Sequence, residues 1–222
     1  MLDRILSPGL QALLWDASVE TAVMVAASTL IAVLAGLPLA LLLLVTAPGG
    51  LAPSRVLHRP LGVLVNAVRS VPFIILMVAL VPLTRVLAGS SIGTGAAIVP
   101  LAIAATAFVA RLFEQALREV DRGLIEAAQA MGATRLQVVA KVLIPEAAPG
   151  LLAGVTVTLV SLVGYSAMAG AVGGGGLGDL GIRFGYQRFM PEVMAIVVAL
   201  LIVVVQGLQS LGDFLVRRAS RR

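Results

Sequence analysis

The stretch TAVMVAASTLIAVLAGLPLALLLLVTA, residues 21–47, contains no charged residue. A helix needs about 20 apolar residues to cross the hydrocarbon core of a bilayer, so this stretch is long enough to span one. It is hydrophobic on all sides rather than striped, which is typical of membrane helices. The whole chain is 59% hydrophobic and only 12% charged, whereas a soluble domain carries about 25% charged residues. We therefore predict an all-α, polytopic membrane protein.

Five apolar stretches are long enough to span a membrane. The second of them carries Arg69 and two prolines, Pro72 and Pro82. The predicted spans are residues 21–46, 61–84, 91–110, 149–172 and 193–212. Together they make one transmembrane domain over residues 21–212, with an N-terminal tail over 1–20, a loop over 111–146 and a basic tail over 213–222.

The distribution of Lys and Arg predicts the orientation, because cytoplasmic loops of membrane proteins are enriched in these residues. With the N-terminus outside, eleven of them fall on the cytoplasmic side: Arg55, Arg59, the five from Arg111 to Lys141, and the four of RRASRR at 217–222. Four fall outside: Arg4, Arg85, Arg183 and Arg188. We predict a periplasmic N-terminus and a cytoplasmic C-terminus. The first 20 residues carry more acid than base, which favours a translocated tail over a cleavable signal peptide.

Arg69 falls within the second predicted span. A charged residue inside a span is functional by default. Arg69 lies eight residues into its span from the cytoplasmic side, where a long side chain reaches the headgroups easily. We therefore expect a structural role for Arg69.

Several classes of function are excluded by the residues that the chain lacks. There is no Cys, and His58 alone cannot build a histidine metal site. The single Lys, Lys141, follows Ala140 rather than the Gly of a phosphate-binding loop. GYSAM at 164–168 ends in Met168 and is not a nucleophile elbow. The net charge of +5 is scattered between apolar runs, which argues against nucleic-acid binding. We expect no enzymatic activity, catalytic residue, metal or cofactor.

The predicted cytoplasmic loop, 111–146, has the signals of two short helices joined by a sharp turn. Asp121 stands at an N-cap position and Gly132 at a helix stop. Thr134 and Gln137 have the spacing of a capping box. Pro145 then ends the second helix or starts the next span.

The first of these helices carries a charge, Glu126, beside the small residues Ala127 and Ala128. Small side chains allow another protein surface to approach closely. An amphipathic helix that merely rests on lipid headgroups has the same composition. The residues alone leave docking and lipid contact both open.

The spacing within this loop resembles the EAA signature of bacterial ABC importer permeases, EAA-x3-G-x9-I-x-L-P. The matching residues are Glu126, Ala127, Ala128, Gly132, Val142, Ile144 and Pro145, where Val142 stands for Ile and Ile144 for Leu. A second Glu-Ala-Ala triplet at Glu146 lacks the following Gly and Pro, so we interpret it as the entry to the fourth span. The resemblance implies that the loop forms coupling helices, which dock on a separate ATPase subunit.

Three further stretches are similar to the permeases of methionine ABC importers: RSVPFIILMVALVPLTRV at 69–86, SIGTGAAIVPL at 91–101 and GYSAMAGAVGGGGLGDLG at 164–181. The resemblance implies a homodimer of permeases in the inner membrane lipid, a dimer of ATPase subunits and an extracytoplasmic substrate-binding protein. It also implies import of L-methionine and D-methionine by alternating access. A permease for another small amino acid is the alternative. An ion-coupled secondary transporter is a weaker one, because five spans show no inverted repeat.

The substrate pathway is expected between two copies, since five helices enclose a small pore at best. Tyr165, Ser166 and Met168 are the candidates for lining it. The small residues around them fit tight helix packing within one copy equally well. The run Gly173–Gly176 is expected to be a loop or hinge on the outer side, or a plain flexible linker.

Overall fold

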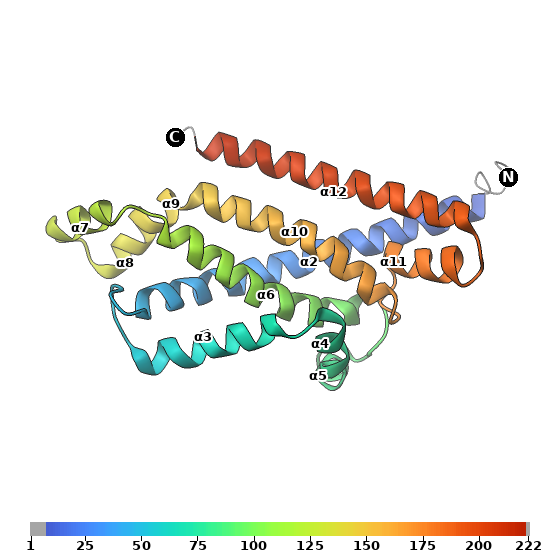
Figure 1. The fold of residues 1–222 in the computed structure, drawn as a ribbon, viewed down its shortest axis with the longest axis horizontal. Helices are drawn as coiled ribbons and strands as arrows, with labels where there is room; N and C mark the ends of the chain where they lie inside the picture. Colours follow the sequence, from blue (N-terminus) through green and yellow to red (C-terminus); the bar gives the residue numbers. More distant parts are fainter. Residues whose placement is uncertain (1–7, 221–222) are drawn as a thin grey trace.

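The computed structural model describes residues 8–220, and every regular element in that range is a helix. Four helices are long and apolar enough to cross a membrane: α2 (Pro8–Thr46), α6 (Thr94–Arg118), α10 (Ala148–Gly170) and α12 (Pro191–Ala219). They run side by side along the long axis of the molecule (Figure 1). The predicted all-α membrane architecture is confirmed.

The longest helix, α2, begins at Pro8, well before the predicted start of the first span at residue 21, and ends at Thr46 as expected. At 1.5 Å per residue its 39 residues measure about 58 Å, which exceeds the hydrocarbon thickness of about 30 Å. Helix α2 packs against α6 and α10 around a core of small and aliphatic side chains. Its most buried members include Met24, Ala32, Leu101, Val109, Phe113 and Leu162.

Residues 61–84, predicted as one span with two prolines, do not form a single continuous helix. The structure instead has α3 (Arg55–Ser70), α4 (Phe73–Ala79) and α5 (Val81–Ala88), with a bend of 107° between α3 and α4. Pro72 has no backbone N–H and disfavours helical backbone in the residue before it. Val71 is accordingly extended, with φ −86° and ψ 128°. Within residues 8–220, four single helices are long and apolar enough to span a membrane, and the bent pair α3–α4 is a fifth candidate if it counts as one span.

The remaining predicted spans correspond to single helices whose ends differ from the prediction. Helix α6 continues past Arg111 to Arg118, so the loop that was predicted to start at residue 111 begins with two turns of helix. Helix α10 begins one residue before the predicted fourth span and ends at Gly170, two residues short of it, and α12 extends the fifth span from Pro191 to Ala219. The sequence predictions for Arg4, Arg221 and Arg222, and for the first seven residues of the predicted tail 1–20, lie outside the described residues.

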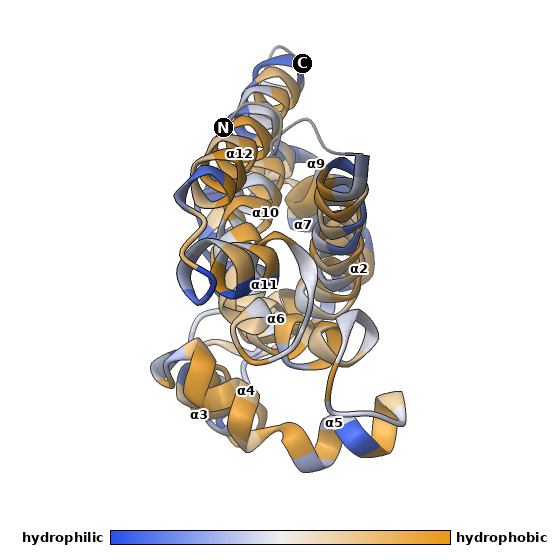
Figure 2. Ribbon diagram, turned by 90° about the vertical axis from the view of Figure 1, so that its right-hand side faces the viewer, coloured by the Kyte–Doolittle hydropathy of each residue, from blue (hydrophilic) through white to orange (hydrophobic). Residues whose placement is uncertain are grey.

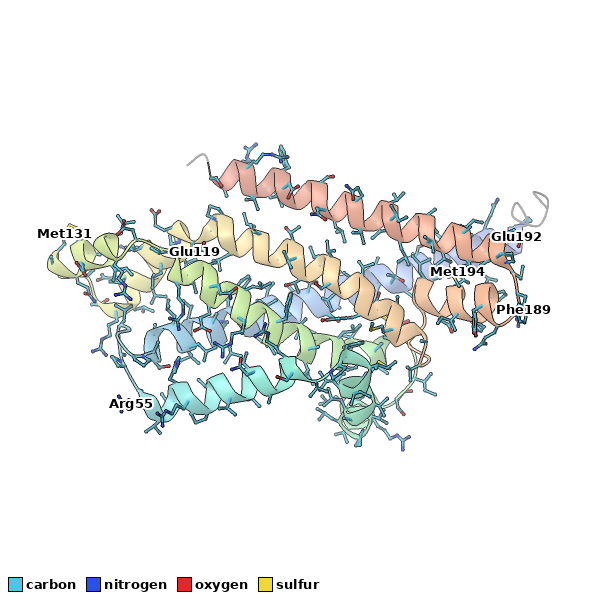
Figure 3. The ribbon with its side chains drawn as sticks, viewed as in Figure 1. Arg55, Glu119, Met131, Phe189, Glu192 and Met194 are labelled. Carbon is cyan, nitrogen blue, oxygen red and sulfur yellow. The ribbon has the colours of Figure 1, made fainter. Side chains whose placement is uncertain are left out.

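Apart from α4 and α5, the short helices lie at the two ends of the bundle (Figure 1). At one end lie α7 (Arg122–Ala130), α8 (Arg135–Val138), the π-helical turn η1 (Val139–Leu143) and α9 (Ile144–Glu146). At the other end lie α11 (Gly176–Leu180) and the π-helical turn η2 (Gly181–Tyr186). Arg55, Glu119 and Met131 mark the first end and Phe189 and Glu192 the second (Figure 3).

Candidate coupling site

Helix α7 starts where the sequence predicts. The side chain of Asp121 accepts a hydrogen bond of 2.6 Å from the backbone N–H of Gly123, which makes it the N-cap. This bond satisfies one of the amide groups that have no partner in the first turn of a helix. The cap separates α7 from the end of α6, so the chain changes direction here.

Helix α7 ends in a Schellman turn centred on Gly132. Gly132 donates its N–H to the carbonyl of Gln129 at 2.9 Å, and Ala133 donates to the carbonyl of Ala128 at 3.0 Å. This pair of bonds requires a left-handed residue after the helix, and Gly132 has φ +83°. A glycine adopts that conformation without steric cost. The predicted helix stop is confirmed.

Helix α8 starts with the predicted capping box. Gln137 N–H donates to the Thr134 hydroxyl at 3.3 Å, and the Thr134 N–H donates to the Gln137 side chain at 2.8 Å. The sequence predicts that Pro145 ends this helix or starts the next span, but the chain stays helical past Pro145 to Glu146 and α10 begins at Ala148. The π-helical turn η1 comes directly before this point. Its wider backbone accommodates the proline ring, which would clash with a carbonyl in a regular α-helix.

The two short helices present an exposed surface at the end of the molecule. Glu126 and Ala127 are exposed, whereas Ala128 is buried against the rest of the chain. Met131 and Leu136, on either side of the turn, are 83% and 77% exposed. Sequence reasoning missed these two side chains. The signal was present, since both are large apolar residues in a segment predicted to lie outside the spans.

A cavity of about 350 Å³ lies between α7, the end of α6 and the loop after α2. Its α7 wall includes Glu126 and Gln129, and its other walls include Leu51, Leu117 and Leu143. Glu126 therefore borders both the exposed surface and this cavity. The remaining residues of the signature lie on the following turns, where Val142 and Ile144 are half-buried and Pro145 is exposed.

The structure places the three pathway candidates in different surroundings. Tyr165 stacks on Phe73 of α4, with ring centroids 4.8 Å apart. Ser166 is buried and donates its hydroxyl to the carbonyl of Val163 at 2.8 Å. Met168 is exposed. The three side chains do not form one surface, although Tyr165 joins α10 to the bent second span.

Residues 43–222 match the family described as the binding-protein-dependent transport system inner membrane component. The chain belongs to this family. It is therefore a multi-pass transport component of the inner membrane, and the resemblance stated from the EAA spacing is confirmed.

Curated relatives carry more specific names. A probable D-methionine transport system permease protein MetI from Vibrio cholerae is 55% identical over 210 residues, which are 95% of this chain and 93% of the relative. A protein of the same name from Pasteurella multocida is 46% identical, over 98% of this chain and 100% of its own length.

Solved structures agree with the fold. A chain from inward-facing conformations of the MetNI methionine ABC transporter superposes with a TM-score of 0.94 at 48% identity, covering 96% of this chain and 99% of its own. An amino acid ABC transporter crystallised with histidines has a TM-score of 0.78 at 22% identity, covering 94% of each chain, and shares the fold alone. The MetNI likeness extends over nearly the whole of both chains at 48% identity, so this chain has the fold of that transporter chain.

Proposed function

We propose that this chain is the permease subunit of an ATP-driven importer that moves methionine, in both its L and D forms, into the cytoplasm. The methionine importer permeases among its relatives, at 46–55% identity over more than nine-tenths of this chain, support that substrate. The MetNI-like fold supports assembly with a separate ATPase subunit. Two copies of the permease, two ATPase subunits and an extracytoplasmic binding protein make up the transporter.

The single observation that carries the coupling role is the helix–turn–helix that the EAA spacing encodes. The exposed Glu126 and Ala127 lie on one side of the turn, and Leu136 lies on the other. A partner that docks here therefore contacts both a charged side chain and apolar side chains. Glu126, Ala127, Ala128, Gly132, Val142, Ile144 and Pro145 form this ATPase-coupling segment. A partner can shift the populations of the inward-facing and outward-facing states only if its affinity for the two states differs. Nucleotide-driven movement of the ATPase pair supplies that difference through these helices.

The same proposal includes the orientation, with the N-terminus periplasmic and the C-terminus cytoplasmic. The coupling end of the bundle holds Arg118, Arg122 and Arg135, and the opposite end holds Arg183 and Arg188. Cytoplasmic ends carry the excess of Arg. A cytoplasm-active reporter fused after Arg222 is expected to be active, and a periplasm-active reporter at the same place is expected to be silent.

The substrate is tested by reconstituting the permease with its ATPase and binding protein in vesicles. We expect ATP-dependent uptake of labelled L-methionine and D-methionine. Uptake of a different small amino acid in place of methionine contradicts the substrate assignment. Uptake that proceeds equally without ATP contradicts the importer class.

A further inference from the structure

Helix α3 has three distinct faces along its 16 residues. Leu61, Val65 and Val68 form the first and pack towards Leu43 and Ala107 of the bundle. The second face is apolar and exposed, and includes Val56, Val63, Leu64 and Ala67. At 100° per residue the third face collects nearly all polar side chains of the helix within one third of its circumference. These are Arg55, His58, Arg59, Asn66, Arg69 and Ser70.

We call Arg55, Arg59, Asn66, Arg69 and Ser70 the polar arc, and all five are exposed. Helix α3 lies at the margin of the molecule, with α4 and α5, away from α10 and α12 (Figure 2). The described residues therefore leave this arc uncovered.

The extent of α3 favours a deeper position in the membrane for Arg69 than a count from residue 61 suggests. Helix α3 starts at Arg55, not at residue 61, so Arg69 stands about 21 Å beyond Arg55 and about 15 Å beyond Arg59 along the axis. The hydrocarbon core is about 30 Å thick, which places Arg69 near its middle when the first two arginines lie at the cytoplasmic headgroups. Cα–Cβ bonds tilt towards the helix N-terminus, away from the outer face. Within residues 8–220, the side chain of Arg69 has no hydrogen bond or ion pair.

The arc continues onto α6 through Arg111. The Arg111 guanidinium donates to the Asn66 side chain at 3.0 Å and to the carbonyl of Gly62 at 3.3 Å. Its other nitrogen is paired with the buried Glu114 at 2.6 Å. Arg111 thus has its counter-charge and Arg69 does not. A membrane-embedded cation that lacks a partner must face water or a polar ligand.

Lipid does not satisfy such a surface, and the interior of the protomer is a packed apolar core. We propose that the polar arc lines a water-filled route between this chain and a second copy, and that Arg69 receives the carboxylate of the amino acid in transit. The proposal rests on the proposed function for the substrate class. A carboxylate fits because guanidinium binds it through two parallel hydrogen bonds.

The route is tested by cysteine accessibility, since the chain contains no Cys. Asn66→Cys and Arg69→Cys place a thiol on the arc, and Leu64→Cys and Ala67→Cys place one at the same depth on the exposed apolar face. The assembled transporter in vesicles is treated with an anionic, membrane-impermeant methanethiosulfonate, and modification of the permease is read by mass spectrometry. Only a thiolate reacts, and hydrocarbon disfavours the charged form. We expect labelling at 66 and 69 to be about tenfold faster or more than at 64 and 67, which corresponds to one pKa unit or more.

Equal labelling of the arc and the apolar face overturns the route. This arm needs no substrate, so it remains decisive if methionine is not transported. If methionine is not transported, the proposed function is wrong, and the labelling rates alone decide whether the route exists.

The role of Arg69 is tested by uptake in the same vesicles. Arg69→Gln is expected to lower uptake at low substrate concentration about tenfold or more, the factor for losing a hydrogen bond to a charged group. Arg69→Lys keeps the charge and is expected to transport better than Arg69→Gln. Arg85→Gln is the matched control, because Arg85 is exposed on α5 and, among the described residues, its side chain donates a hydrogen bond to the Ser91 hydroxyl alone. If Arg69→Gln transports as well as Arg85→Gln, the carboxylate assignment is wrong.

Discussion

The carboxylate of Glu20, on α2, accepts a hydrogen bond of 2.6 Å from the backbone N–H of Gly176, the first residue of α11. The adjacent Thr21 hydroxyl accepts from the N–H of Leu177 at 2.9 Å. The first N–H groups of a helix have no partner within it, and a carboxylate there is also favoured by the helix dipole. A side chain 156 residues away in the sequence therefore caps α11. It fixes the glycine-rich turn between α10 and α11 to the first helix.

This contact predicts the effect of Glu20→Ala. Loss of the cap should lower the free energy of unfolding by about 1–2 kcal/mol, measured as a lower Tm of the purified permease in detergent. Asp16→Ala is the control, because Asp16 is exposed one turn earlier on the same helix and its side chain has no hydrogen bond among the described residues. Equal melting temperatures for the two variants would show that the cap does not stabilise the fold.

The two ion pairs of Glu114 predict that loss of Glu114 costs more stability than loss of one of its two arginine partners. Glu114 is 2% exposed and is bonded to Arg111 at 2.6 Å and to Arg118 at 2.7 Å. Glu114→Ala leaves the mostly buried Arg111 without its counter-charge, which costs about 3–5 kcal/mol. Arg118 is half-exposed, so Arg118→Ala should cost about 1 kcal/mol or less.

The measurement for this pair is the amount of folded, detergent-extractable permease, followed by its Tm. We expect Glu114→Ala to lower both and Arg118→Ala to lower neither strongly. A loss of similar size in Arg118→Ala contradicts the view that Arg111 is the main partner of Glu114.

Two glycines of α12 give a matched pair for helix packing. A Cβ at Gly212 would overlap the side chain of Thr156 on α10, whereas a Cβ at Gly207 meets nothing within 4 Å. Gly212→Ala should force α12 away from α10 and destabilise the fold by about 1–3 kcal/mol. Gly207→Ala should be neutral or stabilising by up to about 1 kcal/mol, because it restricts the unfolded chain. The comparison of the two Tm values decides, and a Gly212 variant as stable as the Gly207 variant refutes the close contact.

Much of the fold follows from the sequence, because a membrane-spanning helix needs a long apolar stretch and such a stretch has few other structural interpretations. Helices α6, α10 and α12 were predictable on that ground. The second span was not, because its composition remains apolar through the bend. The signal was Pro72, whose effect on Val71 is local, whereas hydropathy averages over the whole window.

The coupling segment was predictable for a different reason. Asp121, Gly132 and Thr134 act through hydrogen bonds to residues two or three positions away, so local spacing in the sequence predicts their roles. The Glu20 cap and the clamp of Arg111 on Asn66 join residues far apart in the chain. Single-sequence spacing holds no information about such pairs.

The proposed ATPase contact predicts different outcomes for the two Glu-Ala-Ala triplets. Glu126 is exposed on α7 and borders the cavity beside it, whereas Glu146 is exposed at the entry to α10. Glu126→Lys reverses the charge on the docking surface and should lower ATPase co-purification, while Glu146→Lys should not. Both substitutions change the free energy of the membrane-inserted chain little compared with the insertion of its apolar helices. The amount of permease in the membrane should therefore be unchanged. Equal loss of the ATPase in both variants contradicts the assignment to the first triplet.

Substitutions at Gly132 and at a second glycine distinguish two effects on ATPase binding: a change in the angle between α7 and α8, and backbone strain in the fold. Gly132 has φ +83° and Gly89, the C-cap of α5, has φ +73°, and a Cβ at either position meets nothing within 4 Å. A Val at each therefore brings the same kind of strain, about 1 kcal/mol or more, without a clash. Both variants should insert normally. Only Gly132→Val changes the angle between α7 and α8, so it alone should lose ATPase co-purification and ATP-driven uptake. If Gly89→Val loses the ATPase to the same extent, strain in the fold and not the shape of the docking surface explains the loss, and full uptake by Gly132→Val removes the coupling role from this turn.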